Sequence, residues 1–298
     1  ASFGGGSSRG FGRGTGGGGG LEWTFVFRGD STVFPSRFGK SYADLNPYYT
    51  AAPFYNDTSL FNVTTLGYQD VLITTAGDYI ITATGGSNAK ANSASGAAKG
   101  YGAVVEATFA LEENSALRII AGSSSENTSG AGGSFVFYQQ PGYFNGGTDS
   151  NPLSLPFIVP LSHILVAAGG AGGMQSTGSS NLDSTSANGA QPTFNGAGQP
   201  SGGGDAYEGV NGAGGSWAGS GYSGAGGAGL TGHGTQAYEN GSAAGSYPVK
   251  YGNGFTGGNF NGSYGQGVAG FGGGATGSYG GSGGGGYSGG SGDYSNGG

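Results

Sequence analysis

The sequence contains no cysteine, which excludes disulfide bonds, thiolate metal sites and cysteine nucleophiles. Charged residues make up 8 percent of the chain, against an ordinary share of about 25 percent. The 9 basic residues are outnumbered by 16 acidic ones, which disfavours nucleic acid as a partner because counterion release needs clustered Lys and Arg. The two histidines, His163 and His233, are far apart in the sequence, which disfavours a paired-imidazole metal site. We therefore expect no enzyme activity, no metal and no cofactor.

Long apolar runs are also missing. The run from Ile164 to Ala168 is far shorter than the roughly 20 residues that a membrane helix needs, so we expect no membrane span. The first residue is Ala1 and not Met, which fits a mature chain after removal of a signal peptide. We expect an extracellular or cell-surface protein.

Glycine is abundant but unevenly distributed. It accounts for 75 of the 298 residues, with 11 in residues 1–20, 16 in residues 21–168 and 48 in residues 169–298. This distribution predicts three parts: a glycine-rich N-terminal arm (1–20), a β-sandwich (21–168) and a glycine-rich region (169–298).

The middle part has the alternation and the β-branched and aromatic residues that are typical of strands. We expect strands at 23–28, 68–74, 78–84, 101–111, 116–121, 134–138 and 163–168. Residues 75–77 would close a tight hairpin between the second and third of these strands. A helix over 110–120 is the competing prediction. Short, regularly spaced strands favour an all-β antiparallel sandwich with almost no α-helix.

Two interpretations of residues 169–298 compete. Their Gly, Ser, Asn and Ala content is typical of a flexible linker. Alternatively, glycine-rich chains can pack as extended helices with three residues per turn, whose backbone groups bond neighbouring helices laterally. The glycines lack the strict three-residue repeat that collagen requires. We favour a bundle of short glycine helices.

Aromatic residues recur near the end of the chain at intervals of 7 or 8 residues, which predicts one ring on each pass of the bundle. These residues are Tyr264, Phe271, Tyr279, Tyr287 and Tyr294.

An ordered series of motifs resembles the glycine-rich domain of the anaplastic lymphoma kinase and leukocyte tyrosine kinase receptors. The series runs from Trp23-Thr24-Phe25 to the closing Gly283-Gly284-Gly285-Gly286. The motifs lie at residues 23–27, 76–86, 109–111, 117–122, 130–137, 164–170, 270–274 and 283–290.

That resemblance implies a tumour-necrosis-factor-like β-sandwich joined to a bundle of polyglycine type II helices. The chain departs from the receptors because it has no kinase segment, membrane helix or cysteine, and it stops where they continue into a further strand. The resemblance therefore does not transfer receptor signalling, and an adhesive or structural role is more natural.

Five N-glycosylation sequons occur, and the first three fall in predicted loops. The acceptor residues are Asn56, Asn62, Asn127, Asn240 and Asn261.

These features favour an extracellular structural or adhesive protein that forms a fibre from copies of itself. We expect residues 1–20 to leave their own subunit and fill an edge or groove on the next, with Phe3 and Phe11 as anchors. An arm folded back on its own chain is the alternative arrangement. The alternative function is a binding module, such as a receptor ectodomain fragment or a phage-type adhesin, that recognises a ligand or glycan.

Overall fold

The computed structural model describes residues 7–13, 24–26, 38–63, 66–89, 100–126, 129–142, 144, 163–173, 209–216, 224–235, 255, 257–258, 269–277 and 281–292. Of residues 7–13, 24–26, 89 and 126, the backbone alone is described.

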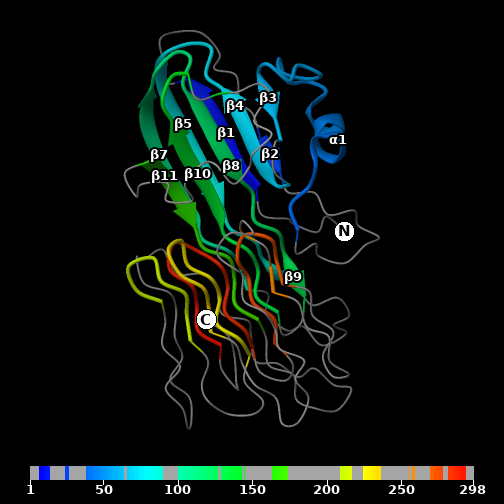
Figure 1. Cartoon of the computed structure of the whole chain (residues 1–298), viewed down its shortest axis with the longest axis vertical. Coiled ribbons are helices and arrows are strands. Elements are labelled where there is room, and N and C mark those ends of the chain that lie inside the picture. Colours follow the sequence, from blue (N-terminus) through cyan, green and yellow to red (C-terminus); the bar gives the residue numbers. More distant parts are fainter. Residues whose placement is uncertain are drawn as a thin grey trace.

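The described part of the chain is all-β, with antiparallel sheets and almost no helix (Figure 1). The helical elements are α1 (Tyr42–Leu45) and the 3-10 helix η1 (Asn46–Tyr49). The strands are β1 (Ser7–Arg13), β2 (Thr24–Val26), β3 (Phe61–Asn62), β4 (Tyr68–Leu72), β5 (Gly77–Thr84), β6 (Asn88–Ala89), β7 (Val104–Leu111), β8 (Ala116–Ile120), β9 (Ser125–Glu126), β10 (Ser134–Gln139) and β11 (Ile164–Ala168).

Two antiparallel sheets form the upper part of the molecule in Figure 1. The first has the strand order β2-β1-β5-β7, and the second has the order β11-β10-β8-β4-β3. The short strands β6 and β9 pair in parallel as a separate sheet. Sequence neighbours such as β4 and β5 lie in different sheets, so the chain crosses between the two sheets.

The main hydrophobic core lies between these two sheets. Ile81 and Ala83 of the first sheet are fully buried, and so are Leu117 and Ile119 of the second. The two residues of each pair are two positions apart in their strand, as expected when alternate side chains face the core. Burying one such large aliphatic side chain contributes about 1.5–3 kcal/mol, so this shared core holds the sheets face to face.

The segment that contains α1 and η1 covers one part of this core. A capping box starts α1: Ser41 Oγ accepts from the Asp44 N–H at 3.3 Å, and the Asp44 carboxylate accepts from the Ser41 N–H at 3.0 Å. Behind this turn, the rings of Tyr49, Phe54 and Phe61 contact one another with centroids 5.1–5.6 Å apart. The segment is thereby fixed to β3 by aromatic packing.

The structure confirms the strands expected between Tyr68 and Ala168 to within a few residues at their ends. The competing helix at 110–120 is wrong, because this stretch contains the end of β7 and all of β8. The hairpin expected at 75–77 is also wrong. There, β4 pairs with β3 and β8, whereas β5 pairs with β1 and β7.

Candidate functional site

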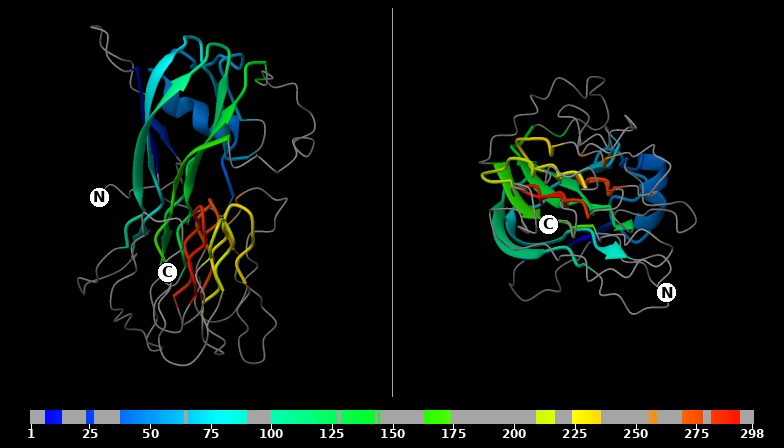
Figure 2. Two further views of the ribbon diagram at one scale, coloured as in Figure 1. Left: turned by 90° about the vertical axis from the view of Figure 1, so that its left-hand side faces the viewer. Right: turned by 90° about the horizontal axis from the view of Figure 1, so that it is seen from below.

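At one end, the strands of both sheets continue into glycine-rich segments that lie beside the glycine segments from later in the chain (Figures 1 and 2). We call this part the glycine region. It comprises residues 85–88, 100–103, 121–126, 129–133, 169–173, 209–216, 224–235, 269–277 and 281–292.

Backbone hydrogen bonds in the glycine region repeat every three residues. Six consecutive amides, those of residues 225–230, donate to carbonyls on three different neighbouring segments in rotation. The donor–acceptor pairs are Ala225–Thr276, Gly226–Thr235, Gly227–Gly290, Ala228–Gly273, Gly229–Gly232 and Leu230–Tyr287, at 2.8–3.2 Å.

This pattern differs from that of a β-sheet. A strand presents its amides and carbonyls along two opposite edges, so it bonds to at most two neighbours. Here the amides of residues 225–230 alone reach three neighbours, and residues three apart reach the same one. An extended backbone with three residues per turn presents its polar groups in this way.

Segment 281–286 shows the same period and bonds to several neighbouring segments. The carbonyls of Ser282 and Gly285 accept from Gly173 and Gly170, and the amides of Gly283 and Gly286 donate to the same segment, at Ala225 and Ala228. Further bonds reach Ala131, Ala275 and Gly290. The bonds to residues 129–133 cross the boundary predicted at residue 168, because that segment leads into β10 of the second sheet.

The glycines allow the segments to approach until their backbones touch. A Cβ atom at Gly284 would lie 2.2 Å from the Gly170 carbonyl oxygen, and one at Gly285 would lie 2.1 Å from that of Gly272. Contacts this short are prohibitive, so side chains cannot enter the interior at these positions. The high glycine content is therefore a packing requirement of the region.

Of the five spaced aromatics, the structure describes Phe271 and Tyr287. Phe271 is 1 percent exposed and belongs to a second hydrophobic cluster. Its ring covers Gly67, where a Cβ atom would lie 2.3 Å from the ring. Tyr287 is partly exposed, and its carbonyl accepts from the Leu230 N–H. Tyr264, Tyr279 and Tyr294 lie outside the described residues.

The second cluster joins the glycine region to the outer face of the second sheet. Phe255 lies 4.6 Å from Phe135 and 6.2 Å from Phe137, measured between ring centroids. Together with Phe271, it packs on β8 and β10. Phe255 could not be predicted from the sequence, because its neighbours carry no recurring apolar pattern.

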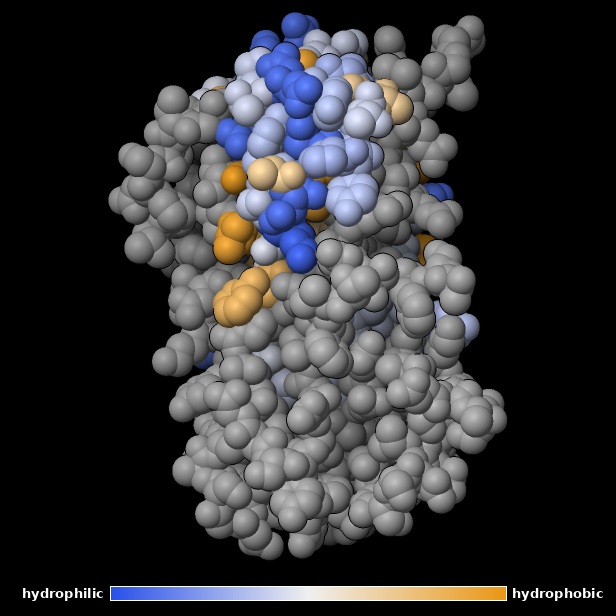
Figure 3. Space-filling view, turned by 90° about the vertical axis from the view of Figure 1, so that its right-hand side faces the viewer, coloured by the Kyte–Doolittle hydropathy of each residue, from blue (hydrophilic) through white to orange (hydrophobic). Residues whose placement is uncertain are grey.

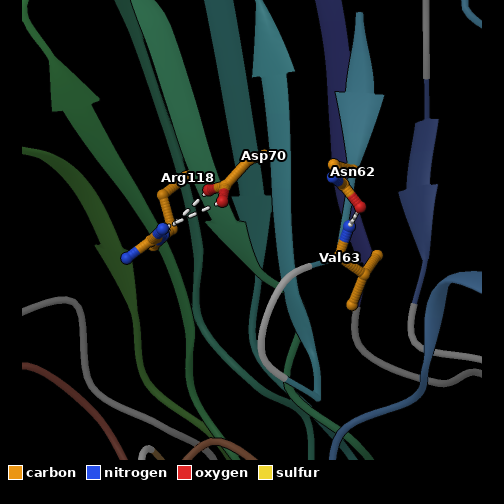
Figure 4. A network of polar contacts seen from close by, with 4 residues as sticks. All are labelled: Asn62, Val63, Asp70 and Arg118. Carbon is orange, nitrogen blue, oxygen red and sulfur yellow. Dashed lines mark hydrogen bonds and ion pairs between the residues drawn. The ribbon is translucent and has the colours of Figure 1, made fainter. Parts of the chain in front are cut away.

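Asp70 and Arg118 form a largely buried ion pair (Figure 4). Arg118 donates from Nε and one terminal nitrogen to the Asp70 carboxylate at 2.8 and 2.9 Å, across the β4–β8 pair. Its guanidinium carbon also lies 5.4 Å from the centre of the Tyr68 ring. Burial raises the pKa of Asp70, and the Arg118 guanidinium opposes that change.

Part of the N-terminal arm forms strand β1. It lies inside the first sheet, where it pairs with β2 on one side and β5 on the other. Phe11 is opposite Ile81 in this register, and Phe3 lies outside the described residues. We expected the arm to fill an edge or groove, whereas β1 lies between two strands of a sheet. Exchange of the arm between subunits stays a prediction.

The structure describes two of the five sequon asparagines. Asn56 is exposed in a turn, as expected. Asn62 was expected in a loop, and this is wrong, because it lies in β3 and is 8 percent exposed. Asn127, Asn240 and Asn261 lie outside the described residues.

A comparison with protein-family models and with curated proteins finds no match to this chain. Within the described ranges, no group of three or more His, Asp or Glu side chains could hold a metal ion. The helices described are too short to cross a membrane.

Proposed function

We propose that this protein is an extracellular structural or adhesive protein, the repeating subunit of a filament assembled head to tail. The observation that carries the proposal is the three-residue hydrogen-bonding period of the glycine region. A region that devotes so much of its backbone to lateral bonding, and whose packed glycines leave no room for a Cβ atom, suits a stiff body better than a site that must admit a substrate.

The glycine segments are, in this proposal, polyglycine type II helices. Three observations support this assignment: the period of three, the approach of neighbouring backbones, and bonds from one segment to more than two others. The motif order supports a relationship with the glycine-rich receptor domains, including their tumour-necrosis-factor-like sandwich. In that order, the motifs occur on β2, β5, β7, β8, β10 and β11 and then in the glycine region.

Assembly uses β1 as the exchanged element. Without it, β5 and β2 would each have an open edge in the first sheet. A β1 strand from another copy can make the same hydrogen bonds to β2 and β5. Exchange therefore changes only which chain supplies β1, and the contacts between the strands stay the same. Residues 14–23, which connect β1 to β2, include six glycines. A connection of this composition can place β1 either in its own sheet or in the sheet of another copy.

Exchange in one direction leaves each subunit with a donated strand and an occupied slot. If the rotation between neighbours does not close a ring, the contact repeats into a filament. Low surface charge suits such a contact, because few ion pairs are available for salt to screen.

Deletion of residues 1–20 tests this function. We expect the full chain to form filaments in electron micrographs, and the truncated chain to be monomeric by light scattering. A synthetic peptide of residues 1–20 should bind the truncated chain, whereas a shuffled peptide should not. Filaments from the truncated chain, or failure of the native peptide to bind it, would contradict the proposal. Monomeric full chains that bind a soluble ligand would favour a binding module.

A further inference from the structure

Asn56 lies in a turn whose geometry exposes its side chain. Its φ angle is +59°, a left-handed conformation that Asn adopts more readily than most residues. The side chain is exposed, as are those of Tyr55 and Thr58. Thr58 is the hydroxyl residue that completes the sequon Asn56-Asp57-Thr58.

A reciprocal pair of hydrogen bonds with Asn46 fixes the orientation of the Asn56 carboxamide. Asn46 Nδ2 donates to Asn56 Oδ1 at 2.6 Å, and the Asn56 N–H donates to Asn46 Oδ1 at 3.2 Å. Since Oδ1 and Nδ2 are the two branches of one planar amide, holding Oδ1 against Asn46 turns Nδ2 away from it. The nitrogen that a glycan would use is therefore left on the solvent side of the turn.

The sequon at Asn62 serves as an internal comparison, because it has the same motif in a different environment. Asn62 lies in β3, opposite Asp70 of β4, and is 8 percent exposed. Its Oδ1 accepts from the Val63 N–H at 2.7 Å, and it lies next to the strand that carries the Asp70–Arg118 ion pair (Figure 4). A sugar on this buried carboxamide would have to displace packed strands.

We propose that Asn56 is an N-glycosylation site, and that the folded protein cannot carry a glycan at Asn62, because a sugar there would prevent β3 from packing. The donor is an oligosaccharide on a lipid diphosphate, and the catalyst is a transferase in the secretory membrane. The Asn56 Nδ2 forms a bond to the anomeric carbon of the first sugar while that carbon's bond to the diphosphate oxygen breaks. The lipid diphosphate leaves, and Nδ2 loses one proton to a base of the transferase. No oxidation or reduction occurs.

The surface around Asn56 suits a solvated glycan. On the side of the molecule that carries α1, hydrophobic atoms occur as small patches between hydrophilic ones (Figure 3). Tyr48 and Tyr55, near Asn56 in the sequence, are 49 and 39 percent exposed. A sugar attached here would extend over exposed apolar surface without entering the core. The inference rests on the extracellular location in the proposed function, but not on filament formation.

The experiment directs the full chain, with an added secretion signal, through a eukaryotic secretory pathway. Enzymatic removal of N-glycans in ¹⁸O-water converts each occupied Asn to a labelled Asp, and peptide mass spectrometry then gives the occupancy of each sequon. We expect a large labelled fraction at Asn56 and almost none at Asn62 in the secreted, folded protein.

Two variants complete the test. Thr58→Ala leaves both hydrogen bonds to Asn46 intact and should abolish label at Asn56, whereas Asn62→Asp should leave that label unchanged. Unmodified Asn56, or equal occupancy at Asn62, would overturn the inference. If a variant is not secreted, its cell-retained form is digested in the same way, so the result is still decisive. Electron microscopy of the same samples tests the filament separately.

Discussion

At the residue scale, the structure depends on positions that have no side chain. In most proteins glycine serves turns, but in the glycine region it is needed because neighbouring backbones touch. The sequence favoured close backbone packing over a flexible linker, and the structure shows that the described glycine segments do pack backbone to backbone. The sequence could not predict which glycine segments are neighbours. Glycines have no side chains, so nothing in one glycine run distinguishes its correct partner from another glycine run.

Replacement of Gly284 or Gly285 by Val should destabilise the region strongly. Each new side chain would collide with the carbonyl of Gly170 or Gly272 and separate segments that are joined by several hydrogen bonds, each worth about 1 kcal/mol. We expect a loss of at least about 3 kcal/mol in the free energy of unfolding, measured by thermal and denaturant melts.

Gly286 provides the control, because a Cβ atom there would have its nearest neighbour 3.1 Å away. Gly286→Ala should therefore lower the melting temperature much less than Gly284→Ala. Unchanged melting of both Val variants would mean that the glycine segments do not pack as described.

At the element scale, alternation of apolar residues predicted β2, β4, β5, β7, β8, β10 and β11. It did not predict β3, β6 and β9, which are two residues long each. It missed β1, because a strand with two glycines and no β-branched residue carries no such signal. It also paired β4 with β5, since a short Gly-containing connection is typical of a hairpin. The two strands instead lie in opposite sheets, and each contributes side chains to the core between the sheets.

The connection between the second sheet and the glycine region depends on Phe271. Its replacement by Ala would leave a cavity among β8, β10 and the glycine segments, because the ring is almost fully buried. We expect Phe271→Ala to lower the free energy of unfolding by about 3–5 kcal/mol.

Phe38→Ala is the matched control for this prediction, since Phe38 is 49 percent exposed. It should lower stability by far less, as measured in the same denaturant melts. Equal effects of the two substitutions would show that Phe271 is not a packing element between the two parts.

At the scale of the whole molecule, one end is a pair of packed sheets and the other is the glycine region (Figure 2). The proposed filament repeats this two-part body through β1, the strand contributed by the arm. The sequence predicted that the arm would be the assembly element, and the structure adds the slot between β2 and β5 that it occupies. The central claim is therefore that this slot is filled by the β1 strand of another copy.

Engineered disulfides test that claim most directly, because the chain has no cysteine of its own. Gly12 of β1 is opposite Ile80 of β5, and Ile80 is opposite Thr108 of β7. Opposed positions in antiparallel strands lie close enough for a disulfide. After mild oxidation of assembled protein, Gly12→Cys with Ile80→Cys should give a ladder of linked chains in non-reducing electrophoresis. The control pair, Ile80→Cys with Thr108→Cys, should give linked monomers. If Gly12→Cys with Ile80→Cys also gives monomers alone, each β1 occupies its own subunit and the account of assembly is wrong.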